Sequence, residues 1–208
     1  MDNNRIKAII FDLGNVLIDF DYTIAAKRIS GFTGRTPQEI FNLFFDSRLT
    51  GLFEEGRISP LEFFAKVKEM LNLKLDYAEF LPIWNEIFFL TEKNQAVYYL
   101  AKTLKNRYKM ALLSNTNTLH FDYLRKHFSV FDAFHHIITS FESGFRKPHP
   151  SIYQKTFNIL EVLPDHVFYT DDRVELAESG CRLGLHGFTF KGVEQLKKDL
   201  LASGIPIN

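Results

Sequence analysis

Short apolar runs that alternate with helical patterns constrain the fold of this chain more than any other feature. Apolar runs of this length are typical of strands that are buried on both faces of a sheet. The runs lie at 8–11, 110–113, 136–139 and 167–170, with a weaker fifth run at 187–190. Amphipathic helical patterns lie between most of them, at 96–106, 151–160 and 193–202. Strands that alternate with helices predict an α/β fold with a parallel sheet.

One long interval lacks this alternation. Residues 22–91 contain helix-like segments and no convincing strand. One helix is expected to begin near Pro37 and another after Ser59, where Ser-Pro-Leu-Glu offers an N-cap, a first-turn proline and an acidic first turn. We expect an all-helical insert after the first strand, with its aromatic residues forming most of its own core. These aromatic residues are Phe41, Phe44, Phe45, Phe53, Phe63, Phe64, Trp84, Phe88 and Phe89.

The composition sets limits on partners and compartment. The chain has 208 residues, with 25 basic and 25 acidic side chains, so its formal net charge is zero. No basic excess or polybasic cluster indicates a nucleic-acid or membrane-surface partner. Cys181 is the single cysteine, which rules out an intramolecular disulfide and a thiolate metal cluster. Because no apolar run has signal-peptide or membrane-span length, we expect a cytoplasmic protein. We expect it to bind neither nucleic acid nor membrane, and we take it as a monomer by default, with a dimer as the alternative.

Polar side chains follow four of the expected strands, close to the point where each strand ends. In open α/β sheets, ligands bind at the carboxyl ends of the strands, so these side chains should converge on one crevice. Taken singly, each has an ordinary explanation as a turn residue, a helix cap or an exposed lysine. The residues are Asp12, Ser114 with Asn115, Lys147, and Asp171 with Asp172.

The charges of these residues suggest a specific chemistry. Three carboxylates repel one another and any phosphate, and a single lysine does not offset them, whereas a divalent cation together with Lys147 does. A set of oxygen ligands favours Mg²⁺ over zinc or copper. Ser114 and Asn115 can donate hydrogen bonds to phosphate oxygens, and Lys147 supplies positive charge for phosphoryl transfer. Asp12 is then available as the attacking carboxylate that forms an acyl phosphate.

Other familiar site patterns are missing from the sequence. It contains no G-x-x-x-x-G-K-[ST] phosphate loop, and no G-x-G-x-x-G follows the first strand. It also has no G-x-S-x-G nucleophile elbow. These absences lower the expectation of a nucleotide-binding protein or a serine hydrolase.

Together these residues give the chain a resemblance to the haloacid dehalogenase superfamily of hydrolases that use an aspartate nucleophile. The four motif positions of that superfamily match Asp12, Ser114, Lys147 and the Asp171-Asp172 pair, in the same order. The resemblance implies a Rossmann-like, doubly wound parallel sheet as the catalytic core, at 1–18 and 92–208. It also implies that residues 19–91 form a helical cap inserted after the first strand.

A narrower resemblance is carried by the stretches "FDLGNVLIDFD", "LLSNTN" and "GFRKP" and by the doubled aspartate. They are similar to a group that includes phosphatases acting on α-D-glucose 1-phosphate. The resemblance implies that Asp12 is both nucleophile and metal ligand, with Ser114 and Lys147 holding the phosphoryl group. The carbonyl of Gly14 is a further implied ligand of Mg²⁺. Within the aspartate pair, Asp172 is favoured over Asp171 as a metal ligand.

Two positions depart from the pattern of the superfamily. Most of its phosphatases carry an aspartate where this chain has Gly14, and that aspartate serves as general acid and base. Leu176 stands where relatives often place Asp or Asn, which makes neighbouring Glu175 a candidate substitute for orienting the metal ligands. In the expected cap, the polar residues that could recognise a sugar are Arg48, Glu54 and Glu55, and residues 17–22 and 90–94 are the expected hinges.

The sequence therefore predicts a Mg²⁺-dependent phosphatase for a small phosphorylated metabolite, such as a sugar phosphate. A metal-independent 2-haloacid dehalogenase is an alternative, because displacing a halide needs no leaving-group acid and tolerates Gly14. The Asp171-Asp172 pair argues against it, because a metal-free site for an anionic substrate gains nothing from two more carboxylates. A catalytically weak module that binds a phosphometabolite is the other alternative, suggested by Gly14 and Leu176.

Overall fold

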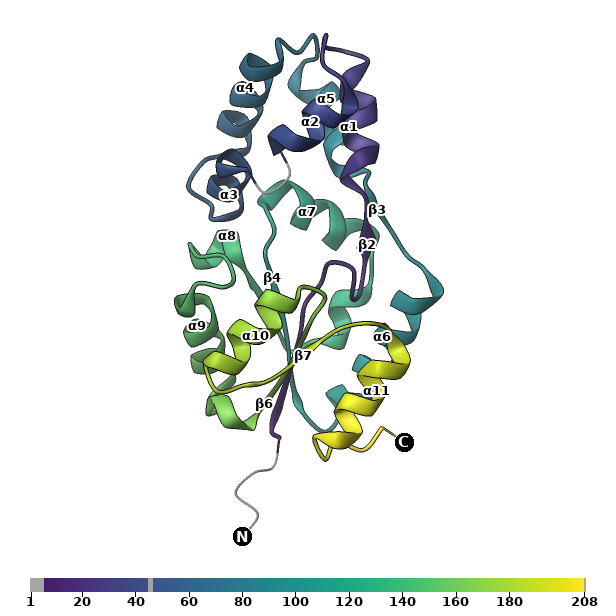
Figure 1. Ribbon diagram of the computed structural model, residues 1–208, viewed down its shortest axis with the longest axis vertical. Helices are drawn as coiled ribbons and strands as arrows, with labels where there is room; N and C mark the ends of the chain where they lie inside the picture. The colour runs from purple at the N-terminus through teal and green to yellow at the C-terminus, as the bar shows by residue number, and fades with distance from the viewer. Residues whose placement is uncertain (1–5, 45–46, 208) are drawn as a thin grey trace.

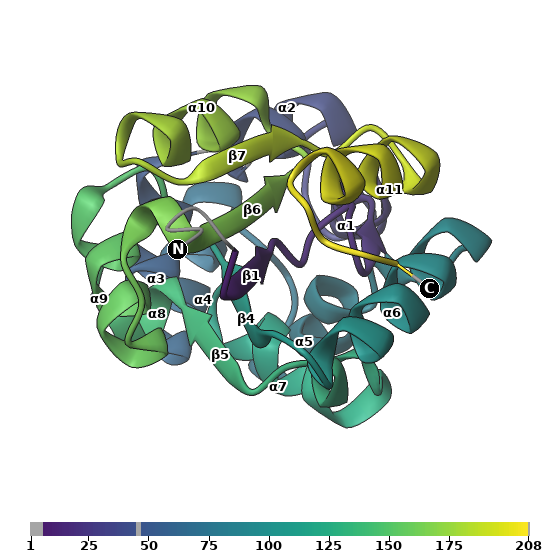
Figure 2. The same cartoon turned by 90° about the horizontal axis from the view of Figure 1, so that it is seen from below.

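The computed structural model describes residues 6–44 and 47–207. Residues 1–5, 45–46 and 208 lie outside the described part, and with them Phe45 of the expected aromatic core and the start of the predicted catalytic core. The described residues contain one sheet of five parallel strands, in the order β5-β4-β1-β6-β7, with β1 at its centre (Figure 2). Its strands are β1 (Ala8–Phe11), β4 (Lys109–Ser114), β5 (His136–Thr139), β6 (Val167–Asp171) and β7 (His186–Thr189).

All five expected strands are confirmed, and the apolar character of the inner strands follows from burial on both faces. In β1, Ile9 and Phe11 face one hydrophobic cluster while Ala8 and Ile10 face another, and all four are fully buried. This alternation is the period of two that a strand imposes on its side chains. A strand that is covered on both sides cannot carry polar residues at alternate positions, so its sequence is apolar throughout.

Helices cover both faces of the sheet, as expected for a doubly wound fold (Figure 2). The Ile9 face packs against α6 (Glu92–Lys105), α7 (Thr118–His127) and α11 (Val193–Ala202). The opposite face packs against α9 (Pro150–Leu160) and α10 (Val174–Arg182), while the short α8 (Ser140–Ser143) follows β5. Two 3₁₀ turns, η1 (Val130–Ala133) and η2 (Pro164–His166), complete the connections.

The insert after β1 folds into a helical layer above the carboxyl ends of the strands (Figure 1). Its described helices share a hydrophobic cluster separate from both faces of the sheet. The rings of Phe53 and Phe63 stack with centroids 4.4 Å apart, and Trp84 packs 4.9 Å from Phe63, so the expected aromatic core is present. The helices are α1 (Tyr22–Ser30), α2 (Pro37–Phe44), α3 (Arg48–Glu54), α4 (Pro60–Leu71) and α5 (Tyr77–Asn85).

The prediction that residues 22–91 contain no strand misses one short element. Where the insert leaves and rejoins the sheet domain, β2 (Asp19–Phe20) pairs antiparallel with β3 (Phe88–Phe89). The two connections must pass side by side, and extended residues in that position can satisfy each other's backbone groups. As a result, Phe88 packs against the core of the sheet domain and Phe89 is 42% exposed, so neither belongs to the aromatic core of the insert.

A network of hydrogen bonds fixes these two connections together. The carboxylate of Asp19 pairs with the ammonium of Lys93 at 2.5 Å and accepts hydrogen bonds from the Thr91 hydroxyl at 3.2 Å and the Asn94 amide at 3.0 Å. Both expected hinge segments, 17–22 and 90–94, therefore contribute to the same network. Any movement of the insert at these hinges must keep or exchange these bonds.

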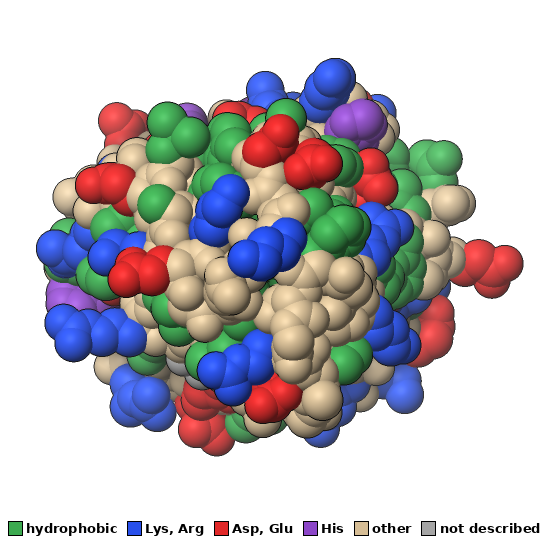
Figure 3. All heavy atoms as spheres, turned by 90° about the horizontal axis from the view of Figure 1, so that it is seen from above, with side chains coloured by type: hydrophobic (Ala, Val, Ile, Leu, Met, Phe, Trp, Pro, Cys, Tyr) green, Lys and Arg blue, Asp and Glu red, His purple; other side chains and the backbone are tan. Residues whose placement is uncertain are grey.

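The outer surface of the insert carries charges of both signs. Lys and Arg side chains are interspersed there with Asp and Glu, and apolar side chains lie between them (Figure 3). Within the described residues, no helix is long and apolar enough to cross a membrane.

The start of α4 shows how a short sequence signal fixes a helix end. The Ser59 hydroxyl accepts a hydrogen bond from the backbone N–H of Glu62 at 3.2 Å, and the Glu62 carboxylate accepts one from the backbone N–H of Ser59 at 2.8 Å. This is the reciprocal capping box, with Pro60 in the first turn. The helix start expected from Ser-Pro-Leu-Glu is confirmed.

We expect Ser59→Ala to lower the free energy of unfolding by about 1 kcal/mol, because an N–H in the first turn of α4 loses its acceptor. Urea denaturation at pH 7.5 measures this change. Glu62→Gln is the matched control, since glutamine can still accept the hydrogen bond from the Ser59 N–H. An alanine variant as stable as the natural protein would show that α4 does not depend on its cap.

Candidate active site

The polar residues expected to converge do so at the carboxyl edge of the sheet, beneath the helical insert. Asp12 directly follows β1, Ser114 ends β4, and Lys147 lies in the loop between α8 and α9. A cavity of about 350 Å³ lies at this edge, bounded by the sheet domain and by side chains of the insert. The expected site residues that line it are Asp12, Gly14, Ser114, Asn115, Lys147 and Asp172.

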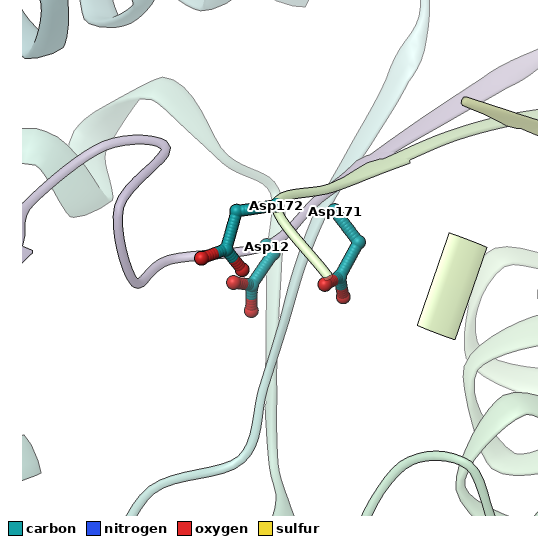
Figure 4. Close-up of side chains that lie close together, drawn as sticks. All are labelled: Asp12, Asp171 and Asp172. Atoms are coloured by element: carbon teal, nitrogen blue, oxygen red, sulfur yellow. The ribbon is translucent and has the colours of Figure 1, made fainter. Parts of the chain in front are cut away.

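Three carboxylates come together at the ends of the two neighbouring strands β1 and β6. One oxygen from each of Asp12, Asp171 and Asp172 lies within 4.8 Å of the others, and the three side chains gather at one point (Figure 4). Asp12 and Asp171 are buried, and Asp172 is partly buried. Such a dense cluster of negative charge requires positive charge nearby to be stable.

Lys147 supplies the positive charge of this cluster. Its ammonium donates to Asp12 at 2.7 Å, to Asp171 at 2.7 Å and to the backbone carbonyl of Leu113 at 2.9 Å. Burial opposes this charge, but the two carboxylates outweigh burial and raise the pKa of Lys147 above its ordinary value. Since an ammonium has three N–H donors, contact with a phosphoryl oxygen requires Lys147 to exchange one of these bonds.

The nucleophile position is strongly affected by its surroundings. Burial raises the pKa of Asp12 to about 7, Lys147 opposes that change, and the charge of Asp171 adds to it. Burial also raises the pKa of Asp172, against the hydrogen bond that its carboxylate accepts from Asn15. The positive charge that the protein itself supplies is therefore too small to hold the pKa of either carboxyl group at its ordinary value. A cation at this point would favour their ionised forms.

Asp171 is directed toward the protein rather than the cavity. It is fully buried and is not among the described residues that line the cavity. Besides Lys147, its carboxylate accepts hydrogen bonds from the hydroxyl of Tyr169 and, at 3.0 Å, from the backbone N–H of Arg173. These contacts suit a residue that fixes Lys147, and they leave Asp172 as the member of the pair that faces the cavity.

Asn115 makes two hydrogen bonds that hold the Lys147 loop in place. Its side-chain oxygen accepts from the backbone N–H of Lys147 at 2.7 Å, and its amide donates to the Lys147 carbonyl at 3.0 Å. The expected phosphate contact of Asn115 is therefore restricted to its second amide hydrogen and its backbone N–H. Positioning of Lys147 is a function of Asn115 that the sequence did not reveal.

Asn15, which was not predicted from the sequence, directly supports the site. Its amide donates to the Asp172 carboxylate at 2.9 Å, and its own carbonyl accepts from Lys93 at 2.9 Å. The backbone of Asn15 is left-handed, with φ of 55°, a conformation that asparagine adopts more readily than most residues. An asparagine directly after the first-motif glycine was the available signal. Through Lys93, Asn15 also connects Asp172 to the hinge network.

The expectation that Glu175 orients the metal ligands is wrong. Its side chain is exposed and pairs with the guanidinium of Arg173 at 2.6 Å, and it is not among the described residues that line the cavity. The first turn of α10 directs Glu175 outward and Leu176 inward, so Leu176 forms part of the cavity wall. Asn15 takes the place of Glu175 as the hydrogen-bond partner of Asp172.

Of the three polar cap residues singled out in the sequence, the structure brings only Glu54 to the cavity. Glu54 ends α3 and lines the cavity wall. Arg48 is exposed, and Glu55 pairs with Arg57 at 2.7 Å. Arg48 and Glu55 are not among the described lining residues.

His120 joins the two parts of the molecule inside the cavity wall. It lies on α7 of the sheet domain, and its ring stacks on Trp84 of the insert with centroids 5.1 Å apart and planes at 16°. One ring nitrogen lies 3.2 Å from the Trp84 carbonyl and the other 3.1 Å from the Asn117 amide. This arrangement needs one donor and one acceptor, which is a neutral imidazole. Burial accordingly lowers the pKa of His120 to about 4.

A parallel sheet with clustered carboxylates and a buried lysine at its carboxyl edge is typical of hydrolases that use an aspartate nucleophile. Comparison with known proteins leads to the same class of enzyme. The chain belongs to the haloacid dehalogenase-like hydrolases, because the model of that family matches residues 6–184. The family expected from the motifs is confirmed.

Individual relatives are similar over nearly the whole chain. The D-ribitol-5-phosphate phosphatase of Bacteroides thetaiotaomicron is 27% identical over 192 residues, covering 88% of this chain and 91% of the relative. The glyceraldehyde 3-phosphate phosphatase of Pyrococcus furiosus is 25% identical over 210 residues, covering 94% and 85%. The solved structure of a HAD family enzyme of Bacteroides thetaiotaomicron in complex with magnesium and inorganic phosphate aligns with a TM-score of 0.78, at 28% identity over 89% of this chain and 94% of that one.

Acid is expected to weaken the protein through His120. Its pKa is lowered from 6.5 to about 4 in the folded state, so the unfolded chain binds more protons between these values and stability falls as the pH drops through this range. A shift of this size amounts to about 2 kcal/mol at pH 5. We expect the natural protein to lose about that much more unfolding free energy than His120→Gln between pH 7.5 and pH 5, measured by urea denaturation.

His127→Gln is the control for this measurement, because His127 is an exposed histidine of the same helix. It should follow the natural protein at both pH values. If His120→Gln and the natural protein lose equal stability on acidification, His120 does not titrate in the folded state as its environment predicts.

Proposed function

We propose that this chain is a Mg²⁺-dependent phosphatase that hydrolyses a small phosphorylated metabolite through an aspartyl phosphate on Asp12. The convergence of Asp12, Ser114, Lys147 and Asp172 on one small cavity carries this proposal. The named activities of the two relatives support it, as does the magnesium and phosphate complex of the HAD family enzyme.

The charges and donor atoms at the site fit a magnesium ion. Three clustered carboxylates meet one ammonium, so a divalent cation brings the cluster to neutrality. We infer that Asp12, the Gly14 carbonyl and Asp172 would hold the ion, with Asp171 fixing Lys147 instead. All of these donors are oxygens, as Mg²⁺ prefers. When bound, the ion supplies positive charge that screens the carboxylate nucleophile from the negative charge of the phosphate.

The chemistry of the protein's own residues follows from their positions. An Asp12 carboxylate oxygen attacks phosphorus, and the new O–P bond forms as the ester P–O bond breaks. Lys147 and Ser114 stabilise the charge on the transferred phosphoryl oxygens. Water then attacks the phosphorus of the acyl phosphate, releasing inorganic phosphate and restoring Asp12. The departing alkoxide takes up one proton in the first step.

The packing around Gly14 leaves no space for a side-chain acid that could supply that proton. A Cβ atom at Gly14 would lie 2.7 Å from Cε1 of Phe20, so the ring of Phe20 occupies the space that a side chain there would need. A carboxylic acid two residues after the nucleophile is thus replaced by an apolar wall. We infer that water or a substrate hydroxyl protonates the leaving group. Such a site favours esters whose leaving groups are relatively acidic.

The volume of the cavity supports a small substrate. About 350 Å³ lies at the lower end of the range for ligand pockets, which suits a compact monoester better than a nucleotide. Glucose 1-phosphate is a proposed substrate, because its leaving group is an anomeric hydroxyl that needs less protonation. Ribitol 5-phosphate and glyceraldehyde 3-phosphate are proposed on the strength of the two relatives.

A panel of phosphate monoesters, assayed for phosphate release with and without Mg²⁺, tests the proposed function. We expect release from at least one small sugar or polyol phosphate, lost with EDTA and restored by Mg²⁺. Asp12→Asn should abolish it, because the amide is not a nucleophile. Asp172→Asn should weaken Mg²⁺ binding by about tenfold or more, measured by calorimetry, because one charged ligand is lost.

Asp122→Asn, at an exposed position of α7, is the control and should leave both measurements unchanged. Metal-independent chloride release from a 2-haloacid would contradict the proposal in favour of a dehalogenase. Tight binding of a phosphate monoester without turnover would favour a binding module.

The contribution of the missing acid is tested by restoring it together with the space it needs. We expect Gly14→Asp alone to be hindered by Phe20, and therefore combine it with Phe20→Leu. This double variant should hydrolyse alkyl phosphates at least about tenfold faster than Gly14→Ala with Phe20→Leu, because general acid catalysis is worth about two to four powers of ten. Aryl phosphates, whose leaving groups need little protonation, should react equally with both variants.

A rate equal in the two double variants for alkyl phosphates would show that leaving-group protonation is already supplied elsewhere in the site. Initial rates over a series of leaving groups of increasing pKa provide the comparison.

A further inference from the structure

An ion pair crosses the boundary between the insert and the sheet domain inside the cavity. Glu54 of α3 lies 2.7 Å from the guanidinium of Arg146, which directly precedes Lys147 in the loop after α8. Both residues line the cavity. The Glu54 side chain is only 9% exposed and that of Arg146 is 23% exposed, so the pair is largely withdrawn from water. Removing both charges from water costs free energy, so an ion pair this buried does not by itself show that it stabilises the fold.

Two glycines of the insert show how closely the parts meet around this pair. A Cβ atom at Gly51 would lie 3.0 Å from Nη1 of Arg146. A Cβ atom at Gly56 would lie 2.4 Å from the backbone oxygen of Phe141 in α8. The absence of a side chain at Gly51 lets α3 approach Arg146, and its absence at Gly56 lets the turn after α3 approach α8. Because Glu54 and Arg146 come from different parts of the molecule, this section of the cavity is complete only when the insert is docked.

The hydroxyl of Tyr22 adds to the polar groups near this pair. Burial raises the pKa of Tyr22, the charge of Glu54 raises it further and that of Arg146 opposes the change, so Tyr22 is a neutral phenol near both charges. Tyr22 also lines the cavity. Much of the remaining cavity lining is apolar. It includes Ile18, Phe20, Phe44, Phe88, Leu124 and Leu176.

We propose that Glu54 and Arg146 form a hydroxyl-recognition subsite that selects phosphate monoesters with an uncharged, hydroxyl-bearing tail. This inference rests on the proposed function. A hydroxyl can donate to the Glu54 carboxylate and accept from the Arg146 guanidinium, and so satisfies both partners at once. A carboxylate or a second phosphate on the tail could pair with Arg146 only while facing the negative charge of Glu54. A tail without hydroxyls would offer the pair no hydrogen bond in exchange for the water that the tail displaces.

The position of Arg146 in the chain gives this subsite a further consequence. Arg146 would contact the tail while the next residue, Lys147, contacts the phosphoryl end, so one short loop would contact the substrate at both ends. Without the negative charge of Glu54, Arg146 would be available to a tail carboxylate. Replacing Glu54 should therefore shift the preference of the enzyme from neutral tails toward acidic tails.

Three five-carbon esters that differ only in the tail test the subsite. They are ribitol 5-phosphate, 5-phosphoribonate, which ends in a carboxylate, and pentyl phosphate, which has no hydroxyl. We expect the natural enzyme to prefer ribitol 5-phosphate over both. Glu54→Gln should lower kcat/KM for ribitol 5-phosphate by about tenfold or more. The same variant should change kcat/KM for pentyl phosphate by less than about threefold, and it should raise kcat/KM for 5-phosphoribonate.

Glu55→Gln is the matched control, because Glu55 is the adjacent residue, pairs with Arg57 and lies outside the cavity. It should leave all three substrates unchanged. An equal loss on all three substrates in Glu54→Gln would overturn the inference, because it would indicate a role in docking the insert only. Unchanged ratios would overturn it as well.

A binding measurement separates this inference from the proposed function. Asp12→Asn protein with Mg²⁺ is titrated with the same three esters by calorimetry, with and without Glu54→Gln. Tighter binding of ribitol 5-phosphate than of the other two, lost in Glu54→Gln, would support the subsite even if the natural protein released no phosphate. An active enzyme whose binding preference does not depend on Glu54 would overturn the subsite and leave the proposed function standing.

Discussion

The buried ammonium of Lys147, held between Asp12 and Asp171, is the interaction on which the rest of the site depends. Neither strand end could place a carboxylate so deep in the protein without a positive charge between them. The lysine reaches this point because Asn115 binds both backbone groups of the same residue. The loop after α8, the end of β4 and the ends of β1 and β6 are thereby fixed relative to one another before any substrate arrives.

The insert is attached to this charged centre by a continuous set of polar contacts. Asp172 accepts from Asn15, the Asn15 carbonyl accepts from Lys93, and Lys93 pairs with Asp19 at the start of the insert. The carboxylate proposed to face the metal is therefore two contacts away from Lys93 in one hinge segment and three from Asp19 in the other. Any movement of the insert at these hinges would reach Asp172 through contacts between neighbouring residues.

Much of the fold and half of the site could be read from the sequence, and the division has a physical cause. Strands buried on both faces must be apolar, and residues at their carboxyl ends must converge, so Asp12, Ser114, Lys147 and Asp172 were predictable from local patterns. Contacts between distant segments were not. Asn15 and Asp172 are 157 positions apart, and the Glu54–Arg146 pair depends on how the insert docks. No local pattern shows that Glu175 turns outward to Arg173.

The close approach of Gly51 in α3 to Arg146 limits which substitutions in α3 could change the substrate of this enzyme. Thr50 and Glu54 stand one helical turn apart on the face of α3 that meets the cavity, while Gly51 lies beside them against Arg146. Thr50 also donates to the backbone carbonyl of Phe44 at 2.7 Å, and Glu54 pairs with Arg146, so a substitution at either position alters the packing of α3 together with the cavity wall. A side chain at Gly51 would instead displace the guanidinium of Arg146. One helix therefore combines wall, anchor and spacer within five residues, so a substitution in α3 changes the shape of the cavity and the seating of the insert at the same time.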